Sequence, residues 1–111
     1  MNDDSRIDGP GRRVQPRKPV NKKFILNHYS LGKVSCYSRD LSLSGTFLTG
    51  NFEKVYPGDT VELEFEVGMG ASDTHRFSAS VVRVESGGIA LKFLSLGMDT
   101  YGALLDLTLS A

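Results

Sequence analysis

Residues 60–67, TVELEFEV, carry the most regular pattern in the chain. Apolar and acidic side chains alternate strictly, and a period of two is that of a β-strand. The pattern therefore predicts a strand with one face in a core and one face in solvent. The predicted core face consists of Val61, Leu63, Phe65 and Val67, and the predicted solvent face of Glu62, Glu64 and Glu66. Acidic residues are common on the outer face of a strand, so these glutamates alone do not indicate a metal or acid–base site.

Strand-like segments recur on both sides of this one, separated by turn signals. YPGD at 56–59 has Pro and Gly in the positions that β-turns favour, and Ser86-Gly87-Gly88 is typical of a tight hairpin. Further strands are predicted at 22–29, 33–42, 46–50, 75–85 and 88–94. Six strands with no helix between them predict an all-β fold, a six-stranded antiparallel β-barrel that is closed or nearly closed.

The C-terminal residues 98–111, MDTYGALLDLTLSA, change from strand to helix spacing. We expect a short amphipathic α-helix packed on the barrel or across its mouth. Gly102 weakens this helix by about 1 kcal/mol relative to Ala, so packing has to stabilise it. A terminal strand over 104–109 is the alternative, because LLDLTL also alternates. The predicted buried face of the helix is Met98, Tyr101, Leu104, Leu105 and Thr108.

The N-terminal region differs from the rest in composition and charge. Residues 1–11 are polar and are predicted to be disordered. Pro16 and Pro19 disfavour both a helix and a central strand, so 12–21 is predicted to be an extended linker, followed by the barrel and helix at 22–111. The net charge is zero overall. However, residues 1–23 hold seven Lys/Arg and three Asp, a net of +4, which leaves −4 on the remainder. The basic arm is either a solvated tail, a partner for the acidic body or an anion site.

Several function classes find little support in the sequence. The chain of 111 residues fits one domain, and no apolar run is long enough for membrane insertion. The single Cys36 cannot form an internal disulfide, which suits a reducing cytoplasmic location. His28 and His75 lack ligand spacing, and no catalytic motif is present. We therefore expect neither an enzyme, a bound metal nor a cofactor.

Residues 39–47, RDLSLSGTF, combine a strand period with unusually small polar residues. The alternation predicts Leu41 and Leu43 on one face, with Asp40, Ser42 and Ser44 on the other, and puts Arg39 on the leucine side. Asp40 can accept two hydrogen bonds from the N1–H and N2–H₂ edge of guanine, and Ser42 can donate one. Gly45 allows a bulge, a positive φ or the close approach of a ligand. The role of Ser44 stays open.

Residues 12–17, RRVQPR, supply the complementary cations. In an extended segment Arg13 and Arg17 lie about 13 Å apart and can clamp a ligand from two sides. Arg reads phosphates and the guanine O6/N7 edge, or stacks on a base. Pro16 stiffens the span and lowers the entropy lost on binding. The two segments together favour a small ligand that contains phosphates and guanine.

The pair RxxxR and DxSxxG, with 22 residues between Arg17 and Asp40, resembles the motifs of the PilZ domain. The resemblance covers residues 12–108. It implies a six-stranded antiparallel barrel that binds cyclic di-GMP on its outer surface under the arginine-bearing linker. The ligand-binding residues implied by the motifs are Arg13, Arg17, Asp40, Ser42 and Gly45. Arg12, directly before the first motif arginine, implies an intercalated ligand dimer. Arg83, which interrupts the apolar run VVRV, is a further candidate contact, although an ordinary surface arginine explains it equally well.

The resemblance implies a receptor whose linker changes conformation on binding and which signals through an unidentified partner protein, as a monomer or weak dimer. An adaptor that uses protein contacts without a nucleotide is the alternative. A barrel that binds nucleic acid with its basic arm is disfavoured, because the net charge of −4 on residues 24–111 opposes a phosphate backbone.

Overall fold

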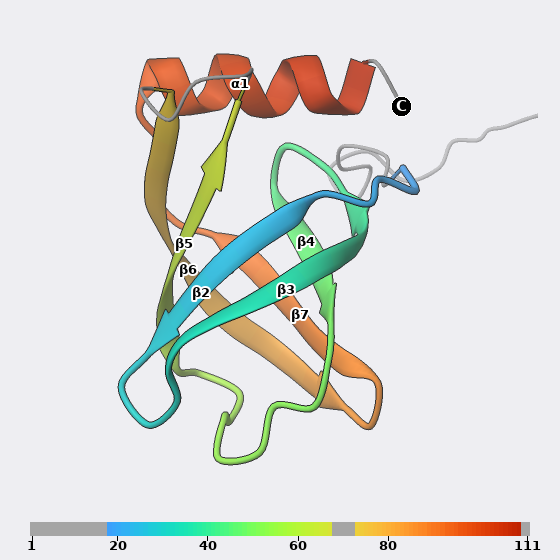
Figure 1. Cartoon of the computed structure of the whole chain (residues 1–111), viewed down its shortest axis with the longest axis vertical. Helices are drawn as coiled ribbons and strands as arrows, with labels where there is room; N and C mark the ends of the chain where they lie inside the picture. Colours follow the sequence, from blue (N-terminus) through green and yellow to red (C-terminus); the bar gives the residue numbers. More distant parts are fainter. Residues whose placement is uncertain (1–17, 68–72, 110–111) are drawn as a thin grey trace, which may run out of the picture.

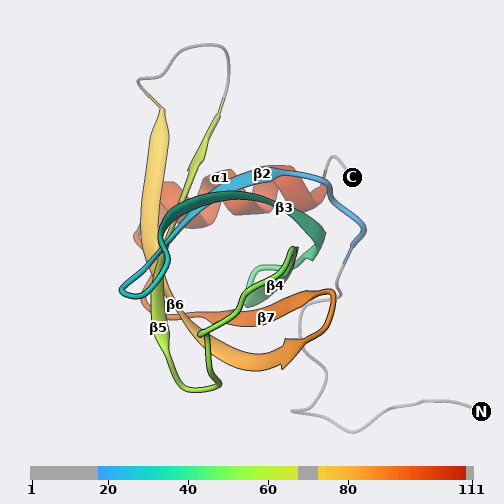
Figure 2. The same cartoon turned by 60° about the horizontal axis from the view of Figure 1, so that its bottom comes forward.

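The computed structural model describes residues 18–67 and 73–109. In this part of the chain six strands close into a barrel, and one helix lies across one end of it (Figures 1 and 2). The elements are β2 (Lys23–His28), β3 (Gly32–Leu41), β4 (Gly45–Thr49), β5 (Thr60–Glu66), β6 (Thr74–Glu85), β7 (Gly88–Phe93) and α1 (Met98–Leu109). Around the barrel the order is β2-β3-β4-β7-β6-β5, with every neighbouring pair antiparallel. The predicted six-stranded antiparallel barrel is confirmed.

Alternating side chains build the core as the sequence predicts. On β5, Val61, Leu63 and Phe65 are buried, and the three glutamates between and after them face outward. Val67 lies just beyond the strand and packs half-buried against the core. Full burial of one such apolar side chain stabilises the fold by about 1.5–3 kcal/mol. Aromatic rings meet at the centre of the core, where the Phe65 ring lies 5.5 Å from that of Phe24 and 6.0 Å from that of Phe77.

Helix α1 packs on the barrel with a face that agrees with the predicted one only in part, at Leu104 and Thr108. Met98 is 90% exposed and Tyr101 is 44% exposed, so their predicted burial is wrong. The buried residues are Thr100, Leu104 and Thr108, flanked by the partly buried Ala103 and Leu107. Apolar residues lie on several sides of this helix, so helical spacing alone does not select one stripe. No helix in the described residues is long and apolar enough to cross a membrane.

Two hydrogen bonds show why α1 can bury threonines. The hydroxyl of Thr100 lies 3.1 Å from Nδ1 of His75 on β6, and that of Thr108 donates to the Leu105 carbonyl at 2.9 Å. A buried hydroxyl with a partner avoids the cost of an unsatisfied polar group. A polar residue on a helix can therefore face the core when its hydroxyl is hydrogen-bonded. A prediction of the buried face from apolar residues alone does not identify such positions.

A buried histidine ties the end of β2 to the turn before β5. The backbone N–H of Ser30 donates to Nδ1 of His28 at 3.0 Å, so Nδ1 carries no proton in this arrangement. Nε2 of His28 then donates to Oδ2 of Asp59 at 2.9 Å. The same carboxylate oxygen accepts the backbone N–H of Tyr56 at 2.9 Å. The hydrogen bond from His28, followed by that from Tyr56, lowers the pKa of Asp59 from its ordinary value of 3.8.

The first prediction concerns the pH dependence of stability. Because the pKa of Asp59 is lower in the folded protein, the ionised carboxylate stabilises the fold above pH 3.8, and this contribution disappears as the pH falls through the lowered pKa. We expect Asp59→Asn to lower the melting temperature at pH 7 and to approach the wild type near pH 2. Thermal unfolding followed by circular dichroism at both pH values measures the effect. The exposed Glu53→Gln serves as control, and an equal deficit of Asp59→Asn at both pH values would contradict the linkage.

A second prediction concerns Gly88 at the start of β7, which leaves no space for a side chain. A Cβ there would lie 2.1 Å from the carbonyl oxygen of Leu48 and 2.6 Å from Cε1 of Phe47. We expect Gly88→Ala to lower the free energy of unfolding by about 1–3 kcal/mol, the usual cost of overpacking, in urea denaturation. Gly87→Ala is the matched control, because a Cβ at Gly87 meets nothing within 4 Å. Equal stability of the two variants would show that the strands separate easily at this point.

Candidate ligand-binding site

A β-bulge in β3 sets the geometry of the motif segment. Ser38 pairs with Leu48 and Asp40 with Phe47, so Arg39 is an extra residue with no partner position on β4. The bulge lets Ser38 and Leu41 both be buried while Arg39 points to solvent. The prediction that Arg39 lies on the leucine side is therefore wrong, because strict alternation does not continue through a bulge. Arg39 and Asp40 instead lie together on the outer surface.

The strand ends at Leu41, and Ser42 follows it in a turn, where it is buried. Its Oγ accepts the backbone N–H groups of Ser44 and Gly45, each at 3.2 Å, and lies 3.3 Å from the Gly45 carbonyl oxygen. The Ser42 hydroxyl thus closes the turn into β4, as short hydroxyl side chains commonly do. Leu43 packs partly buried against the core.

Ser44 and Gly45 also receive structural roles from this turn. The Ser44 hydroxyl lies 3.1 Å from that of Ser42, and the Ser44 carbonyl accepts the backbone N–H of Phe93 on β7 at 2.8 Å. Positive φ angles occur in the described residues at Lys54, Gly32, Gly50, Gly58 and Gly88, and not at Gly45. Gly45 is buried on β4 opposite Lys92, so its value lies in its lack of a side chain and not in a special φ.

Four paired residues form a line across the outer surface, which we call the outer row. Asp40 pairs with Phe47, Phe47 with Ala90, and Ala90 with Arg83, through β3, β4, β7 and β6. Phe47 and Ala90 alternate along their strands with the core residues Leu48, Ile89 and Leu91 and so point away from the core. Three strand spacings separate the ends of the row by about 14 Å. The predicted residues Asp40 and Arg83 therefore lie on one surface, at opposite ends of an apolar stripe.

Arg39 covers the aromatic part of this row. Its Cζ lies 3.8 Å from the centroid of the Phe47 ring, a cation–π contact. Its Nη2 lies 3.4 Å from Oδ2 of Asp40, close enough for an ion pair with a long hydrogen bond. The Arg39 side chain stays 57% exposed, and that of Asp40 18%. The site therefore has a guanidinium, a carboxylate and an aromatic ring in mutual contact.

The described end of the arm runs beside β3. The backbone N–H of Lys18 donates to the Leu41 carbonyl at 3.0 Å, and the N–H of Leu41 donates to the Lys18 carbonyl at 2.9 Å. The hydroxyl of Ser38 donates to the Val20 carbonyl and accepts the N–H of Lys22 at 2.9 Å. This buried serine was not expected to have a role; its polar side chain at an inward position was the signal. The described residues from Lys18 onward thus run beside the end of β3 (Figure 1), where Leu41 directly follows Asp40.

The other candidate cations are distributed around the row. Arg83 is exposed, and its Nε donates to the Glu85 carboxylate, so it already has a partner. Lys92, not anticipated from the sequence, is exposed and pairs with Gly45 next to the row; a single lysine in the apolar strand GIALKF was the available signal. Arg12, Arg13 and Arg17 lie outside the described residues.

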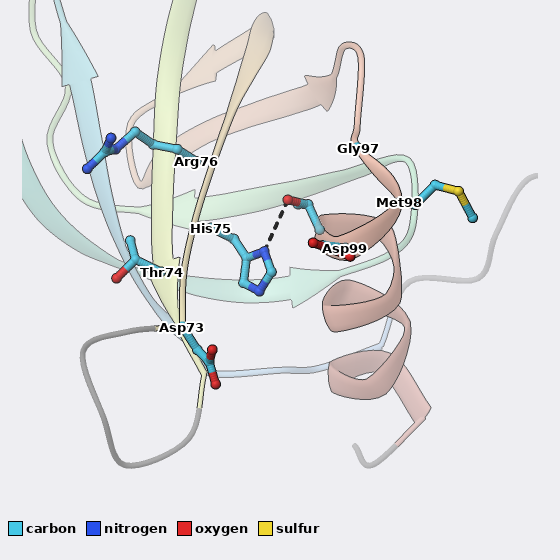
Figure 3. A pocket seen from close by; sticks show the side chains of 8 residues that line it. Asp73, Thr74, His75, Arg76, Gly97, Met98 and Asp99 are labelled. Carbon is cyan, nitrogen blue, oxygen red and sulfur yellow. Dashed lines mark hydrogen bonds between the residues drawn. The ribbon is translucent and has the colours of Figure 1, made fainter.

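An open cleft of about 600 Å³ lies between the start of β6 and the start of α1. Figure 3 shows the His75–Thr100 hydrogen bond within it and Met98 pointing away. Its side chains include both acids and bases and give no single electrostatic preference. Among the residues that the structure describes, no three His, Cys, Asp or Glu side chains cluster as metal ligands.

Cys36 is not activated as a nucleophile. Burial raises the pKa of its thiol to about 11, and its Sγ lies 3.7 Å from the Phe24 carbonyl oxygen. The thiolate, which is the reactive form, is therefore negligible at neutral pH. This thiol packs as a small apolar group in the barrel.

Comparisons with known proteins agree with this architecture. The family model of the PilZ domain matches residues 11–110. The crystal structure of the PilZ domain of CeSA from a cellulose-synthesizing bacterium superimposes with a TM-score of 0.68 and 13% identity, over 86% of this chain and 96% of that one. The structure of the Bacillus subtilis inhibitor of motility, MotI/DgrA, gives 0.70 and 15%, over 91% of this chain and 51% of that one.

At these identities the two structures show a shared fold, and the chain spans about half the length of MotI/DgrA. No curated protein sequence matches the chain. The family is established by the model match, which extends over nearly the whole chain and includes both motifs. The chain therefore belongs to the PilZ domain family, a family of cyclic di-GMP receptors whose domains act as binding modules.

Proposed function

We propose that this chain is a non-enzymatic cyclic di-GMP receptor that binds its ligand on the outer row, under the arginine-bearing arm. The observation that carries the proposal is the pairing of Lys18 with Leu41. That pairing brings Lys18, which directly follows Arg17 in the sequence, beside Leu41, which directly follows Asp40. Family membership supports the identity of the ligand.

The length of the arm fits the row that it would cover. Arg17 is bonded to Lys18, which keeps its Cα within about 3.8 Å of the anchored residue. Arg13 precedes Lys18 by five residues, which reach about 17 Å at full extension. The outer row spans about 14 Å, so Arg13 and Arg17 can contact the phosphates and guanines of one ligand lying along it.

Within the motif we assign different tasks to the individual residues. Asp40, partly exposed on the surface, accepts the N1–H and N2–H₂ edge of a guanine. Ser42 is buried in its turn and acts by holding that turn in shape. Gly45 contributes clearance beside Lys92, which is exposed at the edge of the row. This distribution explains why small residues follow the aspartate.

Ligand binding would change the arm and so create a surface for a partner protein. The phosphates neutralise Arg13 and Arg17, and the arm closes over the row, an order–disorder type of switch. Arg12 favours an intercalated ligand dimer, and Arg83 at the far end of the row is the candidate contact for its second molecule. The proposal includes a cytoplasmic location and a monomer or weak dimer, with no metal or other cofactor.

The third prediction tests the receptor function. Isothermal titration calorimetry with the full chain should show micromolar or tighter binding of cyclic di-GMP. We expect Asp40→Ala and Arg13→Ala each to lower the affinity at least tenfold, because each removes charge-assisted hydrogen bonds worth about 1.5–3 kcal/mol. Glu62→Gln, on the outer face of β5, is the control and should bind as the wild type does. No heat from the wild type would leave the nucleotide-free adaptor as the better description.

The fourth prediction concerns stoichiometry. An intercalated dimer predicts two cyclic di-GMP molecules per chain in the wild type. If Arg12 holds the second molecule, Arg12→Ala should lower the number bound from two toward one while the first site still binds. Calorimetry combined with equilibrium dialysis measures both values. Lys33→Ala, on the hairpin between β2 and β3, is the control for loss of one positive charge. One molecule bound by the wild type would exclude the dimer.

A further inference from the structure

We propose that Arg39, which no motif position includes, is a base-stacking residue of the cyclic di-GMP site, pre-oriented by Phe47 below it. The inference rests on the proposed function. It adds which side chain a guanine of the ligand stacks on. It is carried by the contact of Cζ of Arg39 with the Phe47 ring, 3.8 Å from the centroid.

The contact distance fits a guanidinium that stacks on the ring. Carbon atoms in optimal contact are about 3.5–4.0 Å apart. Cζ of Arg39 lies 3.8 Å from the centroid of the Phe47 ring and is therefore in van der Waals contact with the ring face. The Arg39 side chain is nevertheless 57% exposed, so part of it is open to a ligand.

The support below Arg39 is rigid. Phe47 is only 2% exposed although it points away from the core. Its ring edge lies over Gly88, where a Cβ would be only 2.6 Å from Cε1 of Phe47. The bulge in β3 keeps Arg39 directly beside Asp40 on the same surface. An arginine already held in place loses little side-chain entropy when a base stacks on it, which favours affinity.

The arrangement favours a base over a phosphate as the group that contacts Arg39. A phosphate is read by the N–H edges of a guanidinium in a bidentate fork. Here the Nη2 edge already faces the Asp40 carboxylate at 3.4 Å, while the side chain as a whole stays 57% exposed. Arg planes stack well on nucleobases. A guanine stacked on Arg39 lies beside Asp40, whose carboxylate is the proposed acceptor for its N1–H and N2–H₂ edge.

A second exposed arginine provides the matched comparison. Arg76 on β6 donates from Nε to Glu64 on β5 at 3.1 Å, and its side chain is 60% exposed. It has the same charge, a similar exposure and a carboxylate partner on the barrel surface. Among the described contacts only Arg39 has its guanidinium over an aromatic ring. If Arg39 only forms an ordinary surface ion pair, substitution of Arg39 and substitution of Arg76 should have the same effect on the affinity for cyclic di-GMP.

The test distinguishes the contribution of the planar guanidinium of Arg39 to ligand affinity from that of its positive charge. Cyclic di-GMP is titrated calorimetrically into the wild-type chain and into its variants Arg39→Ala, Arg39→Lys and Arg76→Ala. We expect both Arg39 variants to bind about 5- to 100-fold more weakly, the range for loss of one stacking side chain, because lysine keeps the charge but has no planar face. Arg76→Ala should bind as the wild type does. Melting temperatures of all four proteins verify that they are folded.

The possible results distinguish between a stacking role of Arg39, a role of its charge alone and failure of the proposed function. Wild-type affinity in Arg39→Lys with a loss in Arg39→Ala would show a role of charge alone and overturn stacking. Unchanged affinity in Arg39→Ala would overturn the inference and leave the proposed function intact. No binding by the wild type would overturn both. An NMR titration of the wild type gives an independent readout: a guanine above Arg39 shifts its Nε–H proton upfield through the ring current, and no such shift would contradict the stacking.

Discussion

The extra residue in β3 is the constraint on which the site depends. Without it, the positions on either side of Arg39 would alternate strictly, and Ser38 and Leu41 could not both be buried. Both are needed, since Leu41 packs in the core and Ser38 holds the arm through Val20 and Lys22. The bulge reconciles these demands and turns Arg39 and Asp40 outward together. A binding surface and an anchor for the arm thus arise from one register shift.

The second requirement is a flat surface beside the bulge, which small side chains supply. Gly45, Ala90 and Gly88 lie around Phe47 on β4 and β7. Gly88 cannot carry a side chain, because the carbonyl oxygen of Leu48 and the Phe47 ring occupy the space. Longer side chains occur at the margins of this area, at Arg83 and Lys92. Phe47 and Ala90 at the centre are thus buried, at 2% and 3% exposure, whereas charged side chains lie exposed at the margins.

The sequence predicts the barrel well because alternation is enforced along every strand that separates core from solvent. Residues 60–67 show the pattern most clearly, and their predicted faces are confirmed. Prediction fails where another interaction replaces alternation. The bulge changes the side of Arg39, and a hydrogen bond between Thr100 and His75 favours the burial of Thr100 on the helix. The cross-strand neighbours of Ala90, which are Phe47 and Arg83, are set by register, which no local pattern encodes.

The anchor at Lys18 has a consequence for how the proposed receptor would work. Tethering converts the meeting of arm and bound ligand into an intramolecular step, whose effective concentration is highest when the tether matches the span. Five residues from Lys18 to Arg13 reach about 17 Å, close to the about 14 Å of the outer row. A longer tether would dilute the arginines, and a shorter one could not reach the far end. The two hydrogen bonds between Lys18 and Leu41 therefore set the reach of the arm, although neither residue belongs to a motif.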